Sequence, residues 1–512
     1  MAVIVMYLKN ILLFISFLFL LESARSQDKN WTKNFLIENK KIKFSLGTDE
    51  SLKGIDLYRR CYQMLIRYPL SIENPIAKKI ISGSISAEVA CVDLVDAAHF
   101  DDGGILIHPN LSAFETQRLM LTFQMLHSSW FDAYSFSFSG ENFGTGEFSD
   151  FEQMGYVLSS ALFKNEKISS TLVGKEIFSP IRDEKNTNEY LLSRNPYSGQ
   201  FHPWDHIGLF YDDGTKIETD LPHAPRGALR GIKINNTPYF LKKYYIQYEK
   251  FYENTTTALQ RHFGGGLIGS STYLLLNMGD KVGVIQDGDV RISRRWTRSV
   301  IKDVLCRNLP VLEIDDAKKY IAPNSKNSFS KTQSCVQCHA TMDTFAGAIR
   351  DVQGGVNATG GLDFDTEKNL LKNSKIGFSY LRSVNDSKLL QRKDHPYAFA
   401  APTGRLRLRD FQGREVDQSY KNLDDLGGQL SKLDDFYMCQ TKRYFKFLTG
   451  IEVETDPLIL KSLNLKNDDK QILTQIYIWA MQLKKEQQTK KLIEKIIKSP
   501  FFQHRNFYPI KD

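Results

Sequence analysis

The feature that most constrains this chain is a short cysteine and histidine motif, Cys335-Val-Gln-Cys338-His339. Its Cys-x-x-Cys-His spacing is the attachment signature of a c-type haem. In that chemistry each thiol adds across one haem vinyl group, and the histidine that follows is held beneath the porphyrin, where it ligates the iron. The motif therefore predicts one covalently bound haem c per chain, with Cys335 and Cys338 as anchors and His339 as axial ligand.

Two other uses of the motif are open at this stage. The cysteines could be half of a zinc site, but no second Cys-x-x-Cys exists, and the one His-x-x-x-His, His202 to His206, is interrupted by Pro203. We interpret these two histidines as surface residues. A dithiol redox pair is expected at a strand-to-helix junction, whereas this motif follows a polar loop from Asn324 to Ser334. The spacings favour haem.

The amino terminus predicts export. A basic residue, Lys9, precedes an apolar run, and Ala24-Arg-Ser26 follows as a small-x-small cleavage pattern that would leave Gln27 as the new terminus. The alternative is an uncleaved anchor, because residues 1–21 are almost continuously apolar and nearly long enough to span a membrane. We expect a periplasmic or otherwise exported protein that contacts a membrane only if this segment is retained.

Composition indicates an ordinary globular protein. Of the 512 residues, 42% are hydrophobic and 25% are charged, which allows a substantial core. The formal net charge of +8 is not concentrated in a long basic run. The charge therefore gives no reason to expect nucleic acid as a partner.

Four cysteines lie outside the motif: Cys61, Cys91, Cys306 and Cys439. In an oxidising compartment four thiols allow three pairings. Proximity along the chain favours Cys61 with Cys91, which leaves Cys306 with Cys439. The alternative is four unpaired thiols packed as small hydrophobic residues. Cys61 and Cys91 both fall on apolar helical stripes, and we expect at least one disulfide.

Apolar periodicity predicts a mainly α protein, because stripes at helical spacing lie on both sides of a central segment that prolines and glycines interrupt. Leu406, Leu408 and Phe411 alternate with arginines before Gln412-Gly413, which predicts a β-hairpin. The expected segments are a signal peptide (1–26), a polar lead-in (27–46), a helical domain (47–165), a loop-rich segment of unknown role (166–290) and a helical haem domain with the hairpin inserted (291–512).

Local signals add detail to the first half of the chain. Ser86 is the expected N-cap of one helix, and Ser112 with Glu115 has the capping-box spacing of the next. His127 lies beside the apolar stripe of that second helix, and we interpret it as a core or boundary histidine. Gly264-Gly-Gly266 lacks the lysine of a phosphate-binding loop, so we expect a turn or a close packing site there.

Further motifs give the last part of the chain a family resemblance. They are Arg294-Arg-Trp296, Val304-Leu-Cys-Arg-Asn-Leu-Pro310, the run from Cys335 to Asp343, the stretch from Phe436 to Gly450, and Ser499-Pro-Phe-Phe502. Together they resemble the cytochrome-c-like domains of unknown function found in exported planctomycete and related bacterial envelope proteins. Those families show Met-Asp-Pro after the haem motif and Gly-Arg near the end; here Thr344 replaces the proline, and no arginine follows Gly450. The resemblance covers residues 291–502 and, more weakly, 57–130. It implies haem binding and export, but no substrate.

Three functions follow as hypotheses. The leading one is a monohaem c-type cytochrome that passes single electrons to a redox partner protein in the cell envelope. Met438 is then the expected sixth iron ligand and His395 the other downstream candidate, because Met342 lies on the same side of the porphyrin as His339. The second is a peroxidase-like haem enzyme with an open sixth position. The third is an envelope binding or structural protein that carries a haem domain.

Overall fold

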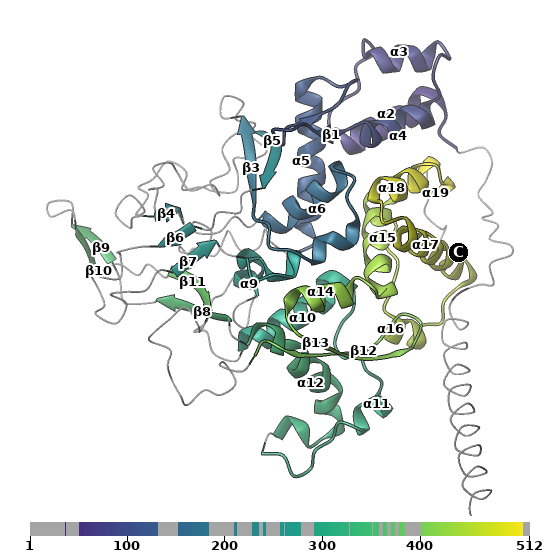
Figure 1. Cartoon of the computed structure of the whole chain (residues 1–512). Coiled ribbons are helices and arrows are strands. Elements are labelled where there is room, and N and C mark those ends of the chain that lie inside the picture. The colour runs from purple at the N-terminus through teal and green to yellow at the C-terminus, as the bar shows by residue number, and fades with distance from the viewer. Residues whose placement is uncertain are drawn as a thin grey trace, which may run out of the picture.

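The protein is mainly helical, as predicted, and the strands that the structure describes form small sheets of two or three strands. Figure 1 shows the helices gathered in one body and the short central strands at its side. The computed structural model describes residues 36, 51–131, 152–183, 262–277, 291–326, 328–350 and 401–504, together with the strands 209–211, 228–234, 239–241, 257–260, 352–357, 362–365, 370–373 and 378–383.

Several expectations fall outside the described residues. The predicted signal peptide, His202, His206 and His395 are among them. Within the part of the chain that the structure describes, no helix has the length and apolar character needed to cross a membrane.

The amino-terminal helices begin where their capping residues predict. Ser86 Oγ accepts a hydrogen bond from the backbone N–H of Val89 at 3.2 Å, and Ser112 and Glu115 form both bonds of a capping box. Both predicted starts are therefore confirmed. The helices are α2 (Gly54–Leu65), α3 (Pro75–Ile81), α4 (Ala87–Asp96), α5 (Ala113–Ser129) and α6 (Gln153–Phe163), with a small hairpin of β1 (His99–Phe100) and β2 (Leu106–Ile107) between α4 and α5.

The central segment contains short strands and tight turns. Gly266 has a φ of +53°, and a Cβ there would lie 2.2 Å from the carbonyl oxygen of Thr171, so the expected close packing is confirmed. The elements are η4 (Ile168–Leu172), the pair β3 (Phe178–Asp183) and β5 (Ala228–Ile234), the sheet of β4 (Leu209–Tyr211), β6 (Tyr239–Leu241) and β7 (Thr257–Gln260), then η7 (Gly266–Gly269) and α9 (Ser271–Leu276).

The last part of the chain contains the predicted hairpin and most of the remaining helices. The hairpin pairs β12 (Gly404–Arg409) with β13 (Glu415–Tyr420) in antiparallel register, and Gly413 turns with a φ of +80°. The helices are α10 (Arg291–Leu305), α11 (Ile314–Lys318), η8 (Ser328–Ser330), α12 (Gln333–Phe345), η9 (Ala346–Ile349), α14 (Leu423–Leu430), α15 (Asp434–Thr449), α16 (Pro457–Ser462), α17 (Asn467–Glu486), α18 (Thr489–Ile497) and α19 (Pro500–Gln503); β8 (Val352–Asn357) pairs with β11 (Phe378–Ser383), and β9 (Leu362–Asp365) with β10 (Leu370–Asn373).

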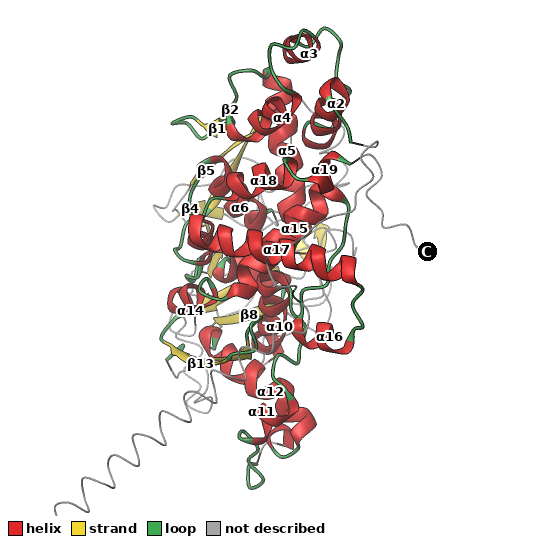
Figure 2. Ribbon diagram, turned by 90° about the vertical axis from the view of Figure 1, so that its right-hand side faces the viewer, coloured by secondary structure: helices red, strands yellow, loops and turns green. Residues whose placement is uncertain are grey.

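The two ends of the described chain share one hydrophobic core. A single cluster of buried side chains runs from Leu57 in α2 to Phe502 in α19. At its edge the ammonium of Lys490 in α18 donates to the carbonyl oxygens of Asp96 (2.9 Å), the last residue of α4, and of Ala98 (2.7 Å), which follows that helix. Figure 2 shows α15, α17 and α18 alongside α4, α5 and α6. The helices of the two expected helical domains therefore stabilise each other.

Two pairs of cysteines lie at disulfide distance. Cys61 and Cys91 join α2 to α4 with an S–S distance of 1.97 Å, and Cys306 and Cys439 join the end of α10 to α15 at 2.05 Å. This is the pairing that proximity along the chain favours.

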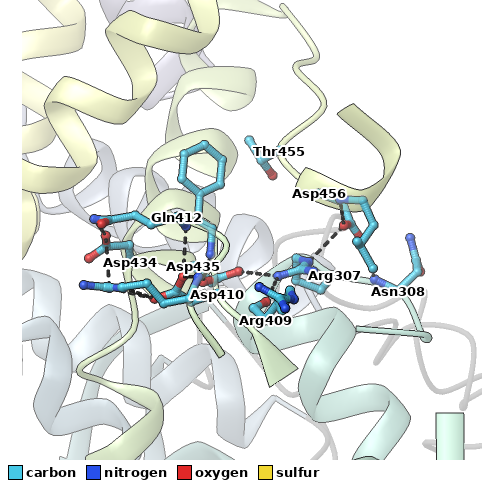
Figure 3. A network of polar contacts seen from close by, with 12 residues as sticks. Arg307, Asn308, Arg409, Asp410, Gln412, Asp434, Asp435, Thr455 and Asp456 are labelled. Carbon is cyan, nitrogen blue, oxygen red and sulfur yellow. Dashed lines mark hydrogen bonds and ion pairs between the residues drawn. The ribbon is translucent and has the colours of Figure 1, made fainter. Parts of the chain in front are cut away.

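A buried ion-pair network holds α10 against the hairpin, α15 and α16 (Figure 3). The Arg307 guanidinium is 1% exposed and donates to Asp435 at 2.7 Å, to Asp456 at 3.0 Å and to the carbonyl oxygen of Arg409 at 2.9 Å. A buried cation of this kind needs all of its partners, because an unpaired charge in the interior costs several kcal/mol. The network therefore fixes the position from which the chain leads into α11 and α12.

His127 is a core residue, which confirms its interpretation. Its side chain is fully buried; Nε2 lies 2.7 Å from the hydroxyl of Tyr444 in α15, and Nδ1 lies 2.7 Å from the hydroxyl of Ser159 in α6. Burial, with a smaller effect from the nearby Arg443, lowers the pKa of His127 to about 3. The imidazole is therefore neutral and links α5 to α15 through hydrogen bonds.

Candidate haem-binding site

The motif lies on α12, whose packed side is set by four apolar or hydroxyl side chains. Val336, Ala340, Thr341 and Phe345 are buried and recur at offsets of 0, 4, 5 and 9, which spread over one half of the helix circumference. Val336 and Ala340 pack with Leu312 and Ala317 into a small core of their own, while Phe345 joins the main core. This packing fixes which side of α12 faces the protein.

The predicted anchor and ligand residues share the opposite side of the helix. Cys335, Cys338 and His339 stand at positions i, i+3 and i+4, so their side chains project from one face. All three are half-buried, and both thiols are free. The structure therefore brings the three motif side chains together on a side of α12 that the protein leaves partly open.

His339 is held by contacts that leave one ring nitrogen for a ligand. Its Nδ1 lies 3.1 Å from Oδ2 of Asp343, one helical turn further along α12. The ring stacks on Phe329 in η8, with centroids 4.5 Å apart and planes inclined by 15°. In the described part of the chain Nε2 has no hydrogen-bond partner. Because Nδ1 and one ring face are occupied, the Nε2 edge is the position that fits an iron atom.

Arg294 in α10 completes the surroundings of the histidine. Its Nε donates to Oδ1 of Asp343 at 2.7 Å and its Nη2 to Oδ2 at 3.2 Å, a bidentate pair. The guanidinium carbon also lies 5.3 Å from the centre of the Phe329 ring. Four side chains, His339, Asp343, Arg294 and Phe329, thus contact one another in a closed circle, which we name the histidine clamp.

The surroundings of Cys338 disfavour the thiolate form of its side chain. Burial, with a smaller effect from Cys335, raises the pKa of the Cys338 thiol. Redox-active Cys-x-x-Cys pairs instead have a lowered pKa. Among the described residues no group of three or more His, Cys, Asp or Glu side chains is arranged to hold a metal ion. The residues present fit haem c, with two thiols and an imidazole edge on one face.

The structure does not bring Met438 next to the motif. Met438 is 1% exposed and lies in the main core, on α15. Figures 1 and 2 both show α12 at one end of the molecule and α15 near its middle. Met438 as sixth ligand stays a prediction, and this arrangement gives it no support.

A pocket of about 590 Å³ lies on a different side of α12 from the thiols. Its lining includes Gln337, which projects about 160° away from Cys335 around the helix. Asn308, Asp456 and Leu458 are among its other walls, and Asp456 also belongs to the Arg307 network. The pocket therefore does not extend the face that carries the motif.

Sequence reasoning found the three motif residues and missed the rest of the histidine clamp. The spacing of His339 and Asp343, i and i+4, is visible in the sequence and was the available signal. Arg294 and Phe329 are 49 and 10 residues away from their partners, Asp343 and His339, and no local pattern pairs them.

Comparison with protein-family models, curated proteins and solved structures gives no match for this chain. The resemblance to exported cytochrome-c-like domains therefore rests on the motif residues alone.

Proposed function

We propose that the protein is an exported monohaem c-type cytochrome that transfers single electrons in the cell envelope. The observation that carries this proposal is the grouping of two free thiols and one imidazole on a single half-buried face of α12. Haem c supplies a one-electron couple when it is bound. Cys335 and Cys338 would anchor it covalently, and His339 Nε2 would ligate its iron.

The remaining residues of the histidine clamp orient the ligand. Asp343 accepts the Nδ1 proton of His339, which selects the tautomer with a free Nε2. Phe329 restricts rotation of the ring by stacking on it. The thiols and the imidazole are only half-buried, so a prosthetic group attached there stays close to the protein surface. A redox partner protein in the envelope would then approach within electron-transfer range.

A haem enzyme with an open sixth position is the second candidate. It is favoured by the location of Met438 in the main core, away from α12. If no side chain of the protein fills the sixth position, a small oxidant could reach the iron. Carbon monoxide distinguishes the two candidates, because a vacant ferrous site binds it rapidly and a six-coordinate carrier does not.

The proposal is tested by the chemistry of attachment. Full-length protein produced in a host that matures c-type cytochromes should keep its haem on the chain after extraction with acid acetone. Cys335→Ala with Cys338→Ala should abolish attachment, and His339→Ala should change the spectrum even where thioethers form. Met120→Leu, at a buried residue of α5 in the main core, serves as the control substitution. Haem that extracts completely from the wild-type protein, or bound zinc in its place, would show that the proposal is wrong.

A further inference from the structure

We propose that Asp343 is a positioning residue that sets the electron donation of His339 to the iron, and that Arg294 limits this donation by sharing the carboxylate. The inference rests on the proposed function and deepens it, because it predicts how the protein tunes the potential of its haem. The histidine clamp carries the inference, since it links the three residues by direct contacts.

The first step concerns the bond between the histidine and the carboxylate. Asp343 Oδ2 lies 3.1 Å from His339 Nδ1, so the Nδ1 proton is donated to a charged acceptor. A carboxylate at this position makes the imidazole a stronger donor at Nε2 than a neutral acceptor does. Stronger donation stabilises the ferric state and lowers the reduction potential.

The second step concerns the arginine. Arg294 donates to both oxygens of Asp343, and its Nη2 reaches Oδ2, the same oxygen that accepts from His339. Because the guanidinium withdraws negative charge from this oxygen, it weakens the pull of the carboxylate on the Nδ1 proton. The two side chains therefore act on His339 in opposite directions. Removing the carboxylate should raise the potential, and removing the guanidinium should lower it.

A purely structural role makes a different prediction. If the clamp only holds the imidazole ring in place, loss of either Asp343 or Arg294 loosens the stacking of His339 on Phe329. Both substitutions would then disturb the haem in the same way and would not shift the potential in opposite directions. Two exposed residues outside the clamp measure the effect on the potential of losing a charge without losing a clamp contact. They are Arg298, one turn further along α10, and Asp315 in α11.

The experiment measures the midpoint potential of the haem-loaded full chain by redox titration, together with the hyperfine-shifted ring protons of His339 in the ferric protein. Asp343→Asn should favour the ferrous state about tenfold, a rise of about 59 mV for one electron. Arg294→Gln should shift the equilibrium several-fold the other way. Asp343→Glu, which restores a carboxylate, should recover part of the wild-type value. The ring protons should move in both main variants.

The controls make the outcomes decisive. Arg298→Gln and Asp315→Asn should change the equilibrium by less than twofold. Shifts of the same sign for Asp343→Asn and Arg294→Gln, or shifts no larger than those of the controls, would overturn the inference. If Asp343→Asn impairs haem attachment, the Arg294→Gln shift decides alone: a lowered potential supports the inference, and an unchanged one contradicts it. Failure of the wild-type protein to attach haem refutes the proposed function instead, so the two failures are distinguishable.

Discussion

The main body and the α11–α12 segment differ in how they are stabilised. The core of the main body is continuous from Leu57 to Phe502, and helices from the first and the last part of the described chain pack together in it. The α11–α12 segment has a separate core of four buried residues, Leu312, Ala317, Val336 and Ala340. A cluster of that size supplies little apolar burial on its own.

This difference indicates which region depends on a bound group, in addition to its own side chains, for its stability. In the main body the core is continuous, and the buried guanidinium of Arg307 is paired with Asp435 and Asp456. The segment that carries Cys335, Cys338 and His339 instead leaves one side of α12 partly open. In our proposal the attached haem supplies the missing apolar surface. The main body is then the support, and the segment is completed by its cofactor.

The largest expected effect tests whether the main body is one cooperative unit. Replacing Cys306 and Cys439 by serine opens a loop of 133 residues and should lower the free energy of unfolding by about 5 kcal/mol in the chain-entropy model. The matched change at Cys61 and Cys91, with a loop of 30 residues, should cost about 3.5 kcal/mol. Urea unfolding followed by circular dichroism measures both. Mass mapping that finds all four thiols free in the wild-type protein would remove the basis for this prediction.

A second prediction uses pH to test the junction between α5 and α15. The pKa of His127 is about 3 in the folded protein and about 6.5 in the unfolded chain, where the imidazole is solvated. Below pH 6.5 the unfolded chain therefore binds a proton that the folded protein excludes, and stability falls as the pH falls towards 3. Between pH 6.5 and 5 this residue should contribute a loss of about 1.6 kcal/mol.

The variant His127→Gln isolates this contribution from other groups, such as His262, whose pKa burial lowers to about 4. The pH dependence of its free energy of unfolding should be flatter than that of the wild-type protein. An identical slope for His127→Gln and the wild type would mean that the junction does not bury a neutral histidine.

The smallest effect addresses the α11–α12 segment directly. Val336→Ala removes two methyl groups from its small core and should destabilise the segment by about 1.5 kcal/mol. Hydrogen exchange should become faster in α11 and α12, with no change in the urea midpoint of the main body. Val300→Ala is the matched control, because Val300 is equally buried but lies in the main core. The comparison between the two regions fails if both variants lower the global midpoint equally.

Local signals in the sequence predicted the parts of the fold that depend on neighbouring residues. The capping box of Ser112 and Glu115 defines the start of α5, and Gly450, with a φ of +77°, is the left-handed residue at which α15 ends. Helix α3 was missed although Asn74 and Pro75 are an N-cap and a first-turn proline that mark its start.

Pairings between distant residues could not be predicted in the same way. The strands β3 and β5 pair across a long stretch of sequence, and Arg307 meets Asp456 across 149 residues. Such contacts depend on how strands and helices pack together in space. The periodicity of apolar residues in the sequence predicts the elements but not their packing partners. In the candidate site the motif face of α12 followed from helical spacing, whereas Arg294 and Phe329 reached His339 and Asp343 only through the tertiary arrangement.

The contact of Lys490 with the end of α4 sets a delay during synthesis, because α4 cannot be covered until α18 has been made. The ammonium and the carbonyl oxygen of Ala98 are 392 residues apart in the chain. At a synthesis rate of about 5–20 residues per second, the first helices wait roughly 20–80 s for the partners that cover them. During that interval their apolar faces are exposed, so a nascent chain of this protein should depend on a holding chaperone, and truncation before α18 should make it aggregate.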